Sequence, residues 1–260
     1  MRFACRAGGP AWLGLVVAVV LVPQVVLAAK TSSSANTVDL FAAIDKGQID
    51  VKVIPKDSSQ LRVMIENKTD KPLAVKLPDA FAAVPILAQA GAPGGPAAKK
   101  QPQNQAVGGG MGMPGAGMGG MPGMGINGGM MNIAPEKVVQ MTAVPTVCLD
   151  NGKGEPRAAI PYVIKRIEDY TTQPGVREIC QMLGNGKINQ RVAQVCAWHL
   201  NNGLSWEKLA SKQLRFADGS SRPYFTPQEI QAARQASAAA VQTAKQRTPE
   251  KSSPASSRQN

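Results

Sequence analysis

The chain has 260 residues and a formal net charge of +12, from 29 Lys and Arg against 17 Asp and Glu. Its basic residues are spread along the sequence, whereas nucleic-acid-binding proteins usually gather them on one face or helix. The composition therefore argues against a nucleic-acid partner and favours acidic glycans or an anionic envelope surface.

Residues 1–28 have the pattern of a cleavable secretory signal. Arg2 and Arg6 supply positive charge, residues 11–22 are almost wholly apolar, and Val26-Leu27-Ala28 is the small-residue ending that a signal peptidase reads. The apolar run of about a dozen residues is shorter than the roughly 20 residues that a helix needs to span a bilayer. We therefore expect an exported protein, periplasmic or extracellular, with no transmembrane helix after cleavage.

Residues 37–87 alternate apolar and polar side chains, which predicts antiparallel strands with one buried face. A short helix precedes these strands and ends at Gly47, where a left-handed helix stop belongs. The alternating apolar positions of the strands are Val51, Val53, Leu61, Val63, Ile65, Leu73, Val75 and Leu77.

Strand patterns return in residues 133–168, at Val138-Val139, Thr146-Val147-Cys148-Leu149 and Tyr162-Val163-Ile164. The early strands alone would leave one apolar face of a sheet uncovered, so the later strands are expected to cover it. We predict an α+β fold in which residues 37–87 and 133–168 form a small antiparallel β-sandwich of the Ig-like kind.

Residues 88–132, between these two stretches, are rich in Gly and Met and contain no aromatic residue. Burial cannot offset the entropy lost on ordering such a segment, so we predict a disordered linker. Residues 248–260 are rich in Ser, Pro, Lys and Gln and are predicted to form a disordered tail.

The methionines of this segment suggest an alternative function. Thioethers are soft ligands that suit Cu(I) or Ag(I), and the segment resembles the methionine-rich segments of exported copper-handling proteins, although it lacks their histidines. A low-complexity linker is the preferred interpretation, and a periplasmic Cu(I)/Ag(I)-binding protein is the first alternative. The candidate ligands are Met111, Met113, Met118, Met121 and Met124.

The apolar period becomes helical in residues 170–225, which we predict to form a short helical bundle. Apolar stripes recur at three- and four-residue spacing, first from Val176 to Leu183 and then from Val192 to Leu200. In the final helix, residues 226–247, a capping box at Thr226-Pro227-Gln228-Glu229 opens an Ala- and Gln-rich stretch. Because this helix has few large apolar side chains, we expect it to be peripheral.

The mature chain has three cysteines in a compartment that is expected to be oxidising. Cys180 and Cys196 lie on the inward stripes of consecutive helices, so a disulfide between them is the first candidate. The alternative is that Cys148, Cys180 and Cys196 are all buried thiols. Their spacing argues against a zinc site with His199, because zinc modules usually present two ligands two to four residues apart on a turn.

The sequence offers no catalytic constellation. His199 is the only histidine, and proton transfer near neutral pH falls most often to histidine. No nucleophile elbow accompanies it. We predict that the protein is not an enzyme, uses no cofactor, and acts as a binding or structural protein of the cell envelope.

Three segments resemble a family of uncharacterised exported proteins of planctomycete-type bacteria. They are residues 61–73 (LRVMIENKTDKPL), 147–153 (VCLDNGK) and 193–200 (AQVCAWHL). The resemblance covers most of the chain outside the linker and tail. It implies the two-part architecture and an exported location, but no activity.

Gln194, Ala197 and Trp198 are also similar to the glutamine-to-tryptophan segment of thioester domains in bacterial surface adhesins. In that family the glutamine bonds to a distant cysteine, and the resemblance implies Cys148 as the partner of Gln194. Ala193 and Cys196 depart from the family, which has threonine and alanine at these positions. A thioester-type surface adhesin is the second alternative function.

Overall fold

The computed structural model describes residues 36–86, 104–111 and 129–247. All of them belong to the larger of two units, residues 34–260. The predicted signal and tail, with Met113, Met118, Met121 and Met124, lie outside the described residues. Among the described helices, none is long and apolar enough to cross a bilayer.

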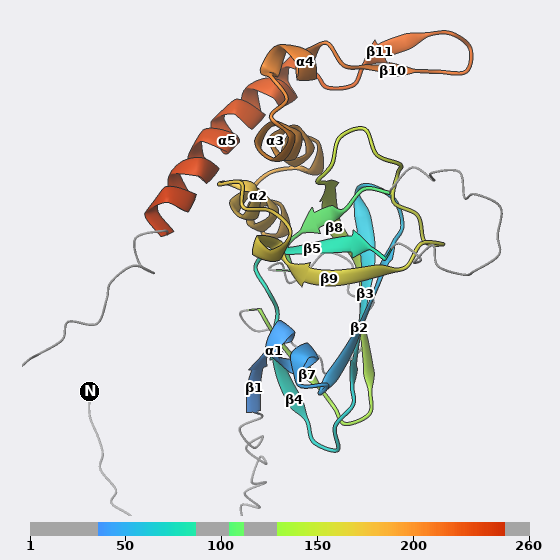
Figure 1. Ribbon diagram of the computed structural model, residues 1–260, viewed down its shortest axis with the longest axis vertical. Helices are drawn as coiled ribbons and strands as arrows, with labels where there is room; N and C mark the ends of the chain where they lie inside the picture. Colours follow the sequence, from blue (N-terminus) through green and yellow to red (C-terminus); the bar gives the residue numbers. More distant parts are fainter. Residues whose placement is uncertain (1–35, 87–103, 112–128, 248–260) are drawn as a thin grey trace, which may run out of the picture. The chain divides into compact units, whose positions relative to one another are not determined.

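A closed antiparallel barrel is the main body of the fold, and its strand order is β2-β3-β8-β6-β5-β9 (Figure 1). The predicted β-sandwich is therefore wrong, although an α+β fold is found. β9 pairs along its length with β5 and meets β2 at Val53 opposite Tyr162, which closes the sheet on itself. The strands are β2 (Ile49–Pro55), β3 (Gln60–Asn67), β5 (Phe81–Pro85), β6 (Val107–Gly109), β8 (Val138–Cys148) and β9 (Tyr162–Arg166).

A smaller sheet is formed by β1 (Asn36–Asp39), β4 (Leu73–Lys76) and β7 (Met130–Ile133). β4 lies in its centre, parallel to β1 and antiparallel to β7. The predicted short helix follows β1 as α1 (Leu40–Asp45) and begins where the Asp39 carboxylate accepts the first free backbone N–H groups.

Asn67 joins the two sheets through its side-chain amide and is completely buried. The amide nitrogen donates to the carbonyls of Lys71, Ile133 and Ala134. The amide oxygen accepts from Thr69, through both its backbone N–H and its hydroxyl. The buried amide is thereby satisfied, as a polar group in a protein interior must be.

Part of the predicted linker belongs to the barrel. β6 lies between β5 and β8, and β7 begins at Met130. The prediction that all of residues 88–132 form a disordered linker is therefore wrong for β6 and for the start of β7. The glycines of β6 allow a close approach, because a methyl group added at Gly108 would come within 2.8 Å of the Cys180 sulfur.

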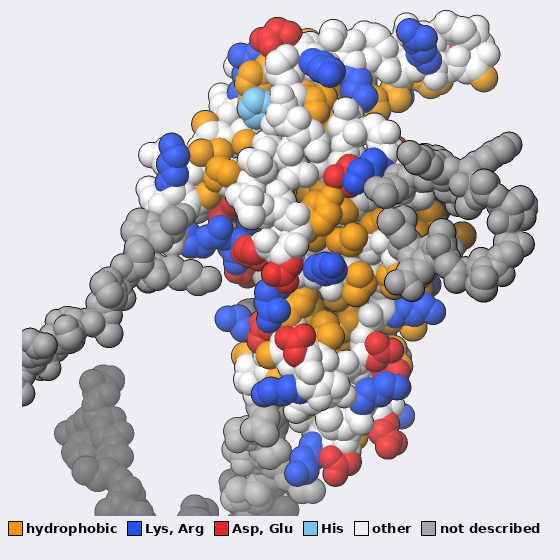
Figure 2. Space-filling model, viewed as in Figure 1, with side chains coloured by type: hydrophobic (Ala, Val, Ile, Leu, Met, Phe, Trp, Pro, Cys, Tyr) orange, Lys and Arg blue, Asp and Glu red, His pale blue; other side chains and the backbone are white. Residues whose placement is uncertain are grey.

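The helices lie against the β6 and β8 side of the barrel (Figure 1). They are α2 (Val176–Gly184), α3 (Gln190–Asn202), α4 (Trp206–Ala210) and α5 (Pro227–Arg247), and a 3-10 turn, η1 (Ile167–Asp169), precedes them. The side chains of Asn189 and Ser205 cap the first turns of α3 and α4, and the predicted capping box between Thr226 and Glu229 is confirmed. On the face drawn in Figure 2, basic and acidic side chains lie interspersed.

Two features of the helical part differ from the prediction. α5 packs on α2 and α3 instead of lying at the periphery, through the small buried residues Ala233, Ala236, Ala240 and Ala244. Between α4 and α5 the chain forms an exposed two-stranded hairpin, β10 (Gln213–Arg215) and β11 (Ser221–Pro223).

Candidate functional site

A β-bulge interrupts the pairing of β3 with β8. Leu61 pairs with Val144 and Val63 with Met141, so that Thr142 and Ala143 together face the single residue Arg62. Ala143 has a φ of 57°, a left-handed conformation that costs a residue with a Cβ about 1–2 kcal/mol. Bulges and strained backbone are common next to functional sites, because the surrounding structure must sustain their cost.

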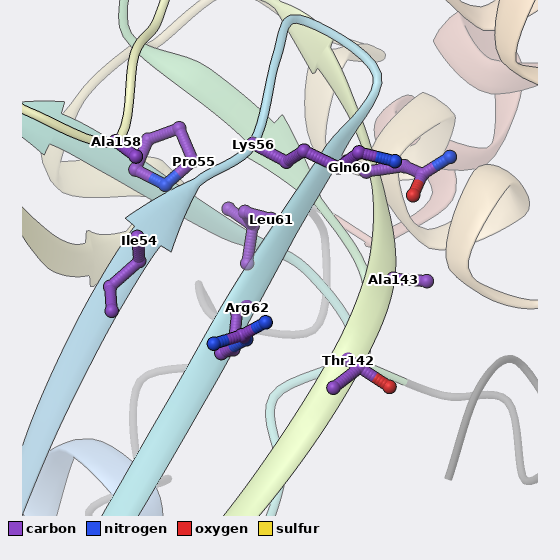
Figure 3. Close-up of a pocket in the computed structure, with 9 residues that line it drawn as sticks. All are labelled: Ile54, Pro55, Lys56, Gln60, Leu61, Arg62, Thr142, Ala143 and Ala158. Atoms are coloured by element: carbon purple, nitrogen blue, oxygen red, sulfur yellow. The ribbon is translucent and has the colours of Figure 1, made fainter. Parts of the chain in front are cut away.

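A groove of about 440 Å³ opens over this bulge, on the outer surface of the barrel (Figure 3). Figure 3 shows Lys56 running across the start of β3 toward Gln60. Arg62 lies two residues after Gln60 on β3. None of the nine lining residues is acidic. They are Ile54, Pro55, Lys56, Gln60, Leu61, Arg62, Thr142, Ala143 and Ala158.

The two cations of the groove have no ion-pair partner among the described residues. Asp57 is adjacent to Lys56, but its carboxylate accepts hydrogen bonds from Ser59 and Gln60, which close the β2–β3 turn. Burial raises the pKa of Asp57, and these hydrogen bonds together with Lys56 outweigh burial, so the pKa lies below its usual value. Asp57 therefore stays ionised within the turn, and the groove itself offers positive charge.

The arrangement suits an anion attached to a partly apolar body. A guanidinium such as that of Arg62 can bind a carboxylate through two parallel hydrogen bonds, and Lys56 adds a point charge. The Gln60 amide can donate to or accept from a hydroxyl group. Ile54, Pro55 and Ala158 provide apolar contact area.

The predicted metal ligands do not form a site in the described part of the chain. Met111 is the only one of the five methionines described there, and it is 4% exposed in the core. No group of three His, Cys, Asp or Glu side chains among the described residues could hold a metal ion. A Cu(I)/Ag(I) site therefore stays a prediction that rests on residues outside the described ranges.

The predicted disulfide is not formed, because Cys180 and Cys196 are free thiols with different neighbours. Cys180 faces Gly108 of the barrel, whereas the Cys196 thiol donates to the carbonyl of Ala233 on α5. Burial raises the pKa of Cys180 to about 12 and that of Cys196 to about 11. Both thiols are therefore neutral near pH 7, which suits buried packing groups.

The predicted thioester partners do meet, but through backbone atoms of Cys148. The Gln194 amide oxygen accepts from the Cys148 N–H at 2.8 Å, and its nitrogen donates to the Cys148 carbonyl at 2.9 Å. β3 begins at Gln60, opposite Pro145, and does not reach Cys148, so Gln194 takes the place of a strand neighbour at this edge of β8. Cys148 is a free thiol, and burial, followed by nearby carboxylates, raises its pKa.

Sequence reasoning missed the groove. Arg62 and Lys56 look like ordinary outward-facing residues of an alternating strand and its turn. Ala143 is an alanine, a residue type that does not signal a left-handed backbone, and nothing in the segment MTAVPT, residues 141–146, marks an extra residue. Only Pro145, a residue that cannot donate to a strand ladder, indicates irregular pairing nearby.

Comparison with known proteins adds no assignment. No family model, curated protein or solved structure matches the chain significantly. The resemblances to exported planctomycete-type proteins and to thioester domains therefore stay predictions.

Proposed function

We propose that this chain is an exported, non-enzymatic binding protein of the cell envelope, and that the groove over the β8 bulge binds an acidic glycan. The observation that carries the proposal is that Lys56 and Arg62 both line a groove without acidic lining. Neither cation has an ion-pair partner in the described part of the chain. A sugar carboxylate supplies the missing charge.

The dimensions and chemistry of the groove agree with a sugar unit. Small-molecule sites usually have volumes of roughly 300–1,000 Å³ and combine apolar walls with a few polar groups. Arg62 and Lys56 would hold the carboxylate, and Gln60 would bond a ring hydroxyl. The apolar walls would contact the C–H face of the ring.

Calorimetric titration tests the proposal on the chain from residue 29 onward. We expect a uronic-acid oligosaccharide to bind and a neutral oligosaccharide of the same length to bind far more weakly. Arg62→Gln should weaken binding about ten- to a hundredfold, since a hydrogen bond to a charged group contributes about 1.5–3 kcal/mol. Lys56→Gln should weaken it less, because an exposed ammonium is a screened point charge.

The matched control is Lys76→Gln, which removes one charge from β4, an element that does not line the groove. Equal binding of the neutral oligosaccharide, or equal losses in Arg62→Gln and Lys76→Gln, would refute the proposal. Thermal unfolding of each variant checks that the fold is retained. Export is tested separately by sequencing the N-terminus of protein from the envelope fraction, where Ala29 should come first.

A further inference from the structure

The hairpin β10-β11 projects from the helical part of the protein and pairs with no third strand among the described residues (Figure 1). From Arg215 to Pro223 every residue is exposed. A two-stranded hairpin of this size is only marginally stable in water, because no third strand or helix among those described packs against its faces. Packing therefore does not explain why the chain forms this hairpin.

The side chains of the hairpin combine an exposed aromatic ring with positive charge. Phe216, just beyond β10, is 45% exposed. The guanidinium of Arg222 lies 5.3 Å from the centre of its ring. Leu214 is directly opposite Arg222 in the ladder and, two residues before Phe216, shares its face. One face of the hairpin is thus apolar and basic together.

The charge of the hairpin is unbalanced. Residues 212–222 contain three basic side chains, Lys212, Arg215 and Arg222, and one acidic side chain, Asp218. Asp218 is engaged within the turn, where it accepts from the backbone N–H and the hydroxyl of Ser220. These hydrogen bonds hold the Asp218 carboxylate against the turn backbone. The Lys212 ammonium lies over the rings of Trp198 and Tyr224, whereas Arg215 and Arg222 are exposed and can meet an external anion.

We propose that this hairpin attaches the protein peripherally to anionic phospholipid bilayers. Basic side chains are attracted to an anionic headgroup layer, while an aromatic ring enters the boundary between headgroups and acyl chains. Phe216 is the inserted group, and Arg215 and Arg222 contact the lipid phosphates. A soluble acidic polymer would satisfy the two arginines but would leave the exposed Phe216 ring without a role.

Vesicle sedimentation tests this attachment, using the chain from residue 29 onward so that the apolar run at residues 11–22 does not contribute. We expect binding to phosphatidylcholine vesicles that contain phosphatidylglycerol and little binding to phosphatidylcholine alone. The double variant Arg215→Ala/Arg222→Ala should lose about 30-fold in affinity, and Phe216→Ala about tenfold. The control Lys76→Ala/Lys137→Ala removes the same charge from exposed positions outside the hairpin and should lose less than threefold.

A second measurement separates the bilayer from a soluble polyanion. In the variant Phe216→Trp, brominated acyl chains should quench the added fluorescence when the vesicles contain phosphatidylglycerol. The proposal is overturned if the hairpin variants bind like the control variant. It is also overturned if Phe216→Ala binds normally and Phe216→Trp is not quenched, which would assign the arginines to an acidic glycan or protein instead.

Discussion

The two sides of the barrel differ in what lies against them: α2 packs on the β6 side, whereas the β3 side carries a groove open to solvent. On the β6 side two of the three strand residues are glycines, and α2 approaches so closely that Gly110, just after β6, and Gly184 leave no room for a methyl group. On the β3 side the strands carry full alternating side chains, and an extra residue in β8 opens a groove to solvent. One barrel thus admits a helix by removing side chains and exposes a groove by inserting a residue.

The largest expected effect comes from filling the contact between β6 and α2. A methyl group at Gly184 would come within 2.5 Å of the Gly110 Cα, a backbone atom that cannot rotate away. We expect Gly184→Ala to lower the free energy of unfolding by about 3 kcal/mol in urea denaturation. Gly203→Ala is the control, because Gly203 has open space around it and should cost only about 1 kcal/mol for its left-handed backbone. Equal losses would show that the helix can shift.

Removing the side chain that completes β8 should have the next largest effect. Gln194→Ala leaves the Cys148 N–H and carbonyl without partners inside the protein, and we expect a loss of about 2 kcal/mol. The exposed Gln242→Ala on α5 should change stability by less than about 0.5 kcal/mol. If the wild-type mass were lower by that of one ammonia, Gln194 would form a thioester and this structural role would be wrong.

Changing the backbone conformation of the β8 bulge should alter both stability and glycan binding. Ala143→Val places a branched side chain in a left-handed conformation, and we expect a loss of about 1–2 kcal/mol together with weaker glycan binding. Ala143→Gly should stay within about 0.5 kcal/mol of wild type, since relief of strain is offset by the backbone entropy of glycine. Ala158→Val, on the groove wall, serves as the control for added volume. A neutral Ala143→Val would show that the bulge is not strained.

The smallest effect concerns how α5 is fixed on the helix side. The Glu229 carboxylate accepts from Arg191 and from the Thr226 N–H, so Glu229→Gln should cost about 1 kcal/mol near pH 7. Burial raises the pKa of Glu229, but Arg191 and Thr226 outweigh burial and lower it. The stabilisation is therefore present above the unfolded value of about 4.3 and is lost as pH falls through the folded pKa. The difference in urea midpoint between wild type and variant should therefore be larger at pH 7 than at pH 3.

Much of the fold follows from periodicity, and the exceptions have physical causes. Alternation in β2 and β3 and the helical stripes of α2 and α3 are visible because large apolar side chains recur along them. β6 was missed because a strand that packs through glycine has no side-chain period. The apolar stripe of α5 was underestimated because its members are alanines. Barrel and sandwich could not be separated, since both bury one face of each strand.

The candidate groove was beyond prediction for a different reason. Lys56 and Arg62 come together with Ala158 only because β2, β3 and the segment before β9 meet at one end of the barrel. Their unpaired charge depends on Asp57 being engaged by Ser59 and Gln60, a geometry that residue types do not reveal. By contrast, the meeting of Cys148 with Gln194 was suggested by a resemblance, and the structure brings these residues together through the Cys148 backbone.

The buried amide of Asn67 also bears on how the protein can be produced. Asn67-Lys68-Thr69 is an acceptor sequence for N-linked oligosaccharides in a eukaryotic secretory pathway. A sugar on the amide nitrogen would displace its bonds to Lys71, Ile133 and Ala134 and would have no path to solvent. A host that glycosylates nascent chains would therefore trap a fraction of the product unfolded, whereas a bacterial host would not.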